Sequence, residues 1–182
     1  MPARTFNSEL AMWVTAVLAD GERVDVGQTP SETPLEIPEC RYWMVSPQSD
    51  VAMDALCDEM IAQDIPKLKW WRATDKGLAI LANRIPERVL IVGTRGLTDA
   101  GMANIPRMTN LEYLDVGGEQ GTDVGMAHVA GMTSLRGLGV GGPNVTDAGL
   151  ACLMALPQLE ELSLYGQGLT DAGLANLTGL TK

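Results

Sequence analysis

The chain has 182 residues, 46% of them hydrophobic, which is enough to bury a core in one domain or in one domain with a small cap. Its formal net charge of −10 argues against nucleic acid as a partner, because phosphate binding needs a basic surface. No stretch approaches the ~18 apolar residues of a membrane span, so we expect no membrane partner.

Cysteine usage bears on the compartment. The three cysteines, Cys40, Cys57 and Cys152, are an odd number without a CxxC pair. This pattern predicts neither a disulfide framework nor a zinc ribbon and favours a reducing environment. We therefore expect the protein in the cytoplasm.

The first expected element is an amphipathic helix at residues 8–20. Its apolar residues follow one helical face: Leu10, Trp13, Val14, Val17 and Leu18. The same period argues against a signal peptide in this segment. Residues 22–26 alternate like a strand, and residues 27–38 have the Pro, Thr and Ser content of a loop. We predict that residues 1–38 form an N-terminal helical cap.

A Thr-Asp pair then recurs five times with an unbroken period of 24 residues. The pairs lie at 74–75, 98–99, 122–123, 146–147 and 170–171. The full unit reads LxxLx[LV], a turn, and [LV]TDxG[LM]Ax[LIV]. Its first half alternates like a short strand, and the apolar residues of its second half are spaced by three, as on one face of a short helix. Thr predicts a helix N-cap, Asp suits the positive helix end, and Gly permits close packing. The Thr-Asp pair therefore indicates a structural role at the start of each helix, because catalytic groups do not recur in this way.

One such unit cannot bury its own apolar face, so successive units are expected to stack into a solenoid. With these motifs the chain resembles the leucine-rich repeat family, in particular its ribonuclease-inhibitor-like and bacterial TDAGL-type arrays. The resemblance covers residues 87–182 as four 24-residue repeats and residues 39–86 as degenerate repeats. It implies an α/β solenoid with a parallel concave sheet, short convex helices and use as a scaffold for protein–protein interaction. The ninth position of the unit departs from the asparagine of many family members: it holds Arg95, Glu119, Pro143 and Gln167.

The expected concave face offers one candidate partner-binding site. The unit 135–158 carries glycine at all three outward strand positions, which predicts a bare notch. The notch and its flanks comprise Tyr113, Asp115, Gly137, Gly139, Gly141, Glu161, Ser163 and Tyr165. Tyrosine gives a large contact area at low entropic cost, so a peptide or a basic side chain is expected here. The alternative is that glycine is simply tolerated at exposed strand positions.

Other patterns predict no chemistry. Residues 137–142 match GxGxxG, yet the first two glycines lie within the expected strand, so we expect no nucleotide or other cofactor. His128 and Cys152 share one position of adjacent units, but two ligands are too few for zinc, so we expect no metal. Bases interleave with tryptophans at 67–76, where we favour a degenerate repeat with at least one buried Trp over an aromatic platform for anions. No arrangement suggests a nucleophile, so we expect no catalytic residue and no enzyme.

The preferred function is therefore a non-catalytic scaffold that binds a protein or peptide. The alternative is a regulatory or targeting domain of a larger sensor or effector system whose catalytic part lies on another chain. A self-assembling structural repeat is a third possibility. The last repeat has no cap, which leaves three outcomes: a longer array, a tolerated short end, or a homodimer through the C-terminal end. The expected dimer contact comprises Leu174, Leu177 and Leu180.

The second position of each unit predicts a column of alternating charge on the sheet. The column comprises Arg88, Glu112, Arg136 and Glu160. Parallel neighbours roughly 4.8 Å apart bring such side chains close enough to pair.

Overall fold

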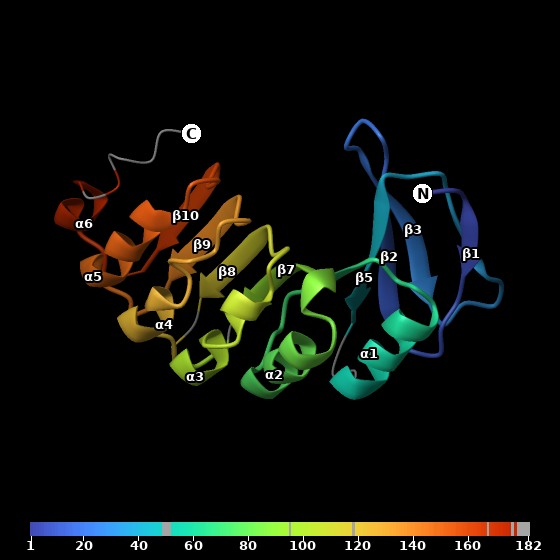
Figure 1. Ribbon diagram of the computed structural model, residues 1–182, viewed down its shortest axis with the longest axis horizontal. Coiled ribbons are helices and arrows are strands. Elements are labelled where there is room, and N and C mark those ends of the chain that lie inside the picture. Colours follow the sequence, from blue (N-terminus) through green and yellow to red (C-terminus); the bar gives the residue numbers. More distant parts are fainter. Residues whose placement is uncertain (49–51, 95, 118, 167, 176, 178–182) are drawn as a thin grey trace. The chain divides into compact units, whose positions relative to one another are not determined.

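A computed structural model describes residues 1–48, 52–94, 96–117, 119–166, 168–175 and 177 of the chain (Figure 1). The chain divides into two compact units, Met1–Trp70 and Trp71–Lys182. This boundary differs from the expected ones after residues 38 and 86. In the described parts of the chain, no helix is both long enough and apolar enough to cross a membrane.

The first unit is built on strands that lie side by side in the order β3, β2, β5 and β6. Strand β2 pairs antiparallel with β3 and with β5, whereas β5 and β6 are parallel. A second, two-stranded sheet is the antiparallel pair of β1 and β4. The elements are β1 (Arg4–Phe6), β2 (Met12–Val17), β3 (Arg23–Thr29), β4 (Leu35–Ile37), β5 (Tyr42–Pro47), α1 (Met53–Ala62) and β6 (Lys67–Trp70).

The predicted helix over residues 8–20 is wrong, because β2 occupies its centre. Met12, Val14 and Ala16 are buried, whereas Trp13 between them is 51% exposed, so the segment follows the two-residue period of a strand. Strands on both sides of β2 satisfy its backbone hydrogen-bonding groups. The predicted strand at residues 22–26 lies largely within β3, and the predicted loop at 27–38 contains the end of β3 and all of β4.

The predicted fold class, a parallel solenoid with a helical N-terminal cap, is also wrong. The pairs β1–β4, β2–β3 and β2–β5 are antiparallel, and the N-terminal unit begins with strands instead of a helix. The protein is a mixed α/β structure. The prediction failed because the 24-residue period of residues 87–182 was extended in degenerate form to residues 39–86, and because residues 1–38 were assigned to a helical cap.

The second unit holds parallel strands in the order β7, β8, β9 and β10. Their register follows the sequence period: Leu114 faces Leu138, which in turn faces Leu162. Helices lie along one side of these strands (Figure 1). The elements are α2 (Asp75–Arg84), a 3₁₀ turn (Pro86–Arg88), β7 (Val89–Thr94), α3 (Asp99–Met102), a 3₁₀ turn (Ile105–Arg107), β8 (Tyr113–Gly117), α4 (Asp123–Ala127), β9 (Gly137–Gly141), α5 (Asp147–Leu150), a 3₁₀ turn (Ala151–Ala155), β10 (Glu161–Tyr165) and α6 (Asp171–Ala175).

The core of the second unit lies between the strands and their helices. It is almost entirely aliphatic: Val92, Met102, Leu111, Leu114, Met126, Leu135, Leu138, Val140, Leu150 and Leu153 are all buried. Because side chains alternate along a strand, the residues between these core positions point to the opposite side of the sheet. We call that side of β8, β9 and β10, which carries Tyr113, Asp115, Glu161, Ser163 and Tyr165, the open face.

Four of the five Thr-Asp pairs join their repeat unit to the next one. The carboxylate of Asp75, Asp99, Asp123 or Asp147 accepts two hydrogen bonds from the threonine of the following pair, one from its backbone N–H and one from its hydroxyl. The predicted N-cap is confirmed where a threonine oxygen accepts a backbone N–H of its own helix, as at Thr74, Thr122 and Thr146. The aspartates therefore serve mainly the neighbouring unit.

Candidate functional site

Three rows of residues cross the open face from β8 through β9 to β10. The strand register places Tyr113 beside Gly137 and Gly137 beside Glu161. The second row is Asp115, Gly139 and Ser163, and the third is Gly117, Gly141 and Tyr165. A column of three glycines thus runs between strands that carry larger polar and aromatic side chains, as the 24-residue period predicts.

The predicted bare notch over these glycines is not bare. A Cβ atom added to Gly137 would overlap the ring of Tyr113, and one added to Gly141 would overlap the ring of Tyr165. The two tyrosines therefore lie directly over the ends of the glycine column. Glycine is needed at these two positions because the rings approach the strand closely. The alternative explanation, that glycine is simply tolerated at exposed strand positions, therefore does not account for Gly137 and Gly141 either.

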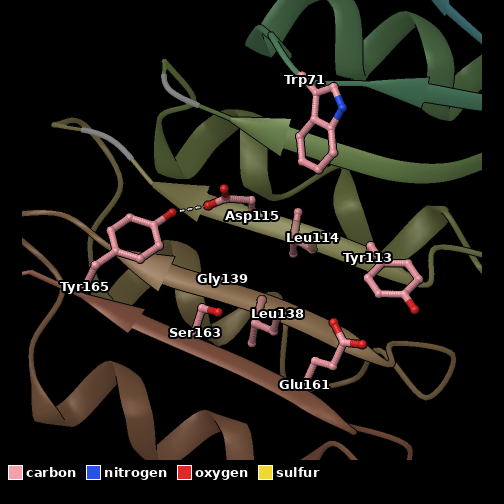
Figure 2. A pocket seen from close by; sticks show the side chains of 10 residues that line it. Trp71, Tyr113, Leu114, Asp115, Leu138, Gly139, Glu161, Ser163 and Tyr165 are labelled. Atoms are coloured by element: carbon pink, nitrogen blue, oxygen red, sulfur yellow. Dashed lines mark hydrogen bonds between the residues drawn. The ribbon is translucent and has the colours of Figure 1, made fainter.

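A pocket of about 180 Å³ opens over the middle of the column (Figure 2). Seven of the eight predicted residues line it, and Gly141 does not, because Tyr165 covers that glycine. Tyr165 and Tyr113 lie at opposite ends of the pocket in Figure 2. The floor is the backbone of β9, with Leu114 and Leu138 beneath.

Trp71 completes the pocket, and the sequence did not assign it to this site. Its ring lies against Gly93 of β7, where an added Cβ would overlap ring atom Cε3. The indole is 50% exposed, whereas the neighbouring Trp70 is only 6% exposed, which confirms the prediction of at least one buried Trp. The sequence did contain one signal for this contact, namely Gly93, because it extends the outward-facing glycine positions to β7. A large ring can lie this close to a strand only where the strand carries glycine.

The pocket walls are rich in hydrogen-bond acceptors. The hydroxyl of Tyr165 donates to Asp115 Oδ1 from across the glycine column. Asp115 is half-buried, whereas Glu161 and Ser163 are exposed on the edge strand β10. Among the described residues that line the pocket, none is Lys, Arg or His. The surface is therefore acidic as well as aromatic.

The predicted charge column is present in part beside the pocket. Arg136 Nη2 lies 2.8 Å from Glu160 Oε2, as an ion pair between exposed side chains. The hydrogen bond that Arg136 donates to Glu160 and the negative charge of Glu160 raise the pKa of Arg136 above its ordinary value. Arg88 instead lies 3.8 Å from Glu87, its own neighbour in the chain. Arg136 is thus held by Glu160, which lies outside the pocket.

The other positions that the sequence singled out give less support for a binding site. The first two glycines of the GxGxxG match, Gly137 and Gly139, lie within β9 as expected. Within the described residues, no group of three or more His, Cys, Asp or Glu side chains is placed to hold a metal ion. At the C-terminal end, Leu174 is 46% exposed and Leu177 is half-buried, while Leu180 lies outside the described residues, so the dimer contact stays a prediction.

A second cavity, in the first unit, is larger but less suited to a ligand. It measures about 380 Å³ and is lined mainly by β1 and β4. Among its described lining residues the one cation, Arg4, already donates to the carbonyl oxygen of Gln63 and lies 5.5 Å from the ring of Trp43. None of the described residues that line this cavity is aromatic. The pocket on the open face is therefore the better candidate site.

Searches of protein-family models and of curated proteins find no family and no relative that matches this chain. The assignment of a function must therefore come from the site.

Proposed function

We propose that the protein is a non-catalytic binding module that takes an extended segment of a partner protein on the open face of β8, β9 and β10. The observation that carries the proposal is the pocket between Trp71, Tyr113 and Tyr165, where two of the three rings are about half exposed: Trp71 by 50% and Tyr165 by 44%. Exposed aromatic side chains around a small pocket are typical anchors of protein interfaces. The likeness of residues 87–182 to leucine-rich repeats, which serve as binding scaffolds, supports the same choice.

A cytoplasmic location fits this proposal. Cys40 and Cys57 are buried in the first unit, and neither they nor Cys152 form a disulfide. Free buried thiols are usual in a reducing compartment. The same binding surface would also serve the alternative function, in which the chain is the targeting part of a larger system with its catalytic part elsewhere.

Selection from a random peptide display library on the immobilised protein tests the proposal. Counter-selection uses Ser163→Trp, which fills the pocket from an exposed position of β10. Met154→Trp is the matched control, since Met154 is 46% exposed and does not line the pocket. We expect selected peptides to bind the wild type and the control but not Ser163→Trp. A library that yields no binders, or only binders unaffected by Ser163→Trp, contradicts the proposal.

A further inference from the structure

We infer that the segment bound on the open face is a Pro-x-x-Pro sequence in the polyproline II conformation, flanked by lysine or arginine. This inference rests on the proposed function and adds the conformation and composition of the bound segment. It follows from the seats of the three rings, from their spacing along β9 and from the pairing of β9 with both of its neighbours.

The three rings of the pocket are held in place in the same way. Each lies over a glycine of a neighbouring strand: Trp71 over Gly93, Tyr113 over Gly137 and Tyr165 over Gly141 (Figure 2). Trp71 and Tyr165 are nonetheless 50% and 44% exposed. Rings that are positioned before binding lose little conformational freedom when a ligand packs against them. Aromatic-lined surfaces of this kind are one of the recurring ways in which proteins recognise proline-rich segments.

The spacing of the two tyrosine rings matches one turn of polyproline II. Gly137 and Gly141, which lie beneath them, are four residues apart on β9, roughly 13 Å along the strand. A polyproline II helix has three residues per turn and rises about 3.1 Å per residue, so prolines three positions apart are about 9 Å apart. Two such prolines fall between the tyrosines, where each can pack against one ring.

The backbone of β9 is already used within the sheet. Residues 137–141 pair with β8 on one side and with β10 on the other. A segment that crosses this face therefore cannot bind by adding a strand to β9. Polyproline II suits such a surface, because it makes no backbone hydrogen bonds of its own and proline has no N–H to satisfy. The hydroxyls of Tyr113 and Ser163 are donors for the carbonyl oxygens that such a segment keeps exposed.

The charge of the chain selects the residues that flank the prolines. The full sequence carries a formal net charge of −10. Complementary charge speeds the encounter of two partners and disfavours partners of like charge. Lysine or arginine beside the prolines is therefore expected.

The experiment is calorimetric titration of the full chain with the blocked peptide Lys-Ala-Pro-Ala-Ala-Pro-Ala-Lys. One control replaces both prolines with valine, which is apolar but favours a β conformation. The other, Lys-Ala-Pro-Ala-Pro-Ala-Ala-Lys, keeps the composition and changes only the spacing. We expect the first peptide to bind at least tenfold more tightly than the valine peptide and at least fivefold more tightly than the respaced one. Equal binding of either control, or no measurable binding of the first peptide up to millimolar concentration, overturns the inference.

Ring variants then locate the binding site. Trp71→Ala should weaken the Pro-x-x-Pro peptide at least tenfold. Trp13→Ala is the matched control, since Trp13 is 51% exposed but lies on β2 of the first unit, and binding should stay within twofold. Tyr113→Leu keeps an apolar side chain over Gly137 without the ring and should weaken binding at least threefold, with thermal melting as the check that each variant is folded. Unchanged binding in Tyr113→Leu, or equal losses in the two tryptophan variants, overturns the inference.

The display selection described above separates this inference from the proposed function. If it yields binders without proline that Ser163→Trp excludes, the proposed function stands and polyproline recognition fails. If it yields no binders and the Pro-x-x-Pro peptide does not bind, both fail.

Discussion

The carboxylate of Asp99 holds Thr122 of the next repeat unit with both oxygens: Oδ1 accepts the backbone N–H at 2.8 Å, and Oδ2 accepts the hydroxyl at 2.7 Å. Oδ1 also accepts the backbone N–H of Gly125 at 3.0 Å. One side chain thus satisfies two backbone donors near the start of the next helix, groups that a helix cannot satisfy by itself. This contact recurs through the second unit and explains why Thr and Asp stay together every 24 residues.

The first prediction concerns the strength of this contact. Asp99→Asn should lower the free energy of unfolding by about 1–3 kcal/mol, because hydrogen bonds to a charged acceptor are lost or weakened. Asp171→Asn is the matched control, since Asp171 holds the same place in its own helix but accepts no hydrogen bond from the described residues. Urea denaturation measures both, and an equal loss in the two variants would assign the effect to the helix start instead.

The second prediction concerns pH. Burial raises the pKa of Asp99, but the hydrogen bonds from Thr122 and Gly125 outweigh it and hold the pKa below its ordinary value of 3.8. At Asp147 the hydrogen bonds from Thr170 likewise lower the pKa. A group with a lowered pKa in the folded state stabilises the fold above the unfolded pKa of about 3.9, and this contribution is lost as the pH falls through the folded value. The free energy of unfolding should therefore fall below about pH 4, and less steeply in Asp99→Asn, as urea titrations at pH 2.5–6 can measure.

The third prediction concerns the glycine two residues after each Asp. A Cβ atom on Gly149 would lie 2.5 Å from Asp123 Oδ1, so Gly149→Ala should destabilise the protein by about 1–3 kcal/mol. In an ordinary helix the same change stabilises by about 0.5–1 kcal/mol. In an Asp123→Ala background most of the cost of Gly149→Ala should vanish. Gly131→Ala is the control, because no atom lies within 4 Å of its added Cβ.

The fourth prediction separates the two glycines beneath the tyrosines. In Gly137→Ala the three atoms nearest to the added Cβ all belong to the side chain of Tyr113, which can rotate, so the cost should stay below about 1 kcal/mol. In Gly141→Ala it meets both the ring and the carbonyl oxygen of Tyr165, and the cost should be about 1–3 kcal/mol. Tyr165→Ala should not rescue Gly141→Ala, because the carbonyl remains. Urea denaturation decides, and equal costs at the two positions would show that the strands adjust freely.

The sequence by itself determined the repeated part of the protein. A strict period of 24 residues sets the strands, the helix starts and the parallel register at once, because each depends on local spacing. It therefore predicted that Tyr113, Asp115, Glu161 and Ser163 share one face with the glycines, and these residues line one pocket.

The tertiary structure alone decided what those groups contact. The apolar residues of the first 20 positions fit a helix and a strand almost equally well, and the neighbours β3 and β5 settled the choice in favour of β2. The hydrogen-bond partners of Asp99 and the position of the Trp71 ring over Gly93 likewise depend on which backbone segments come within a few ångströms of each other. Periodicity encodes the direction in which a side chain points, but the distance to its neighbour is set only when separate elements pack.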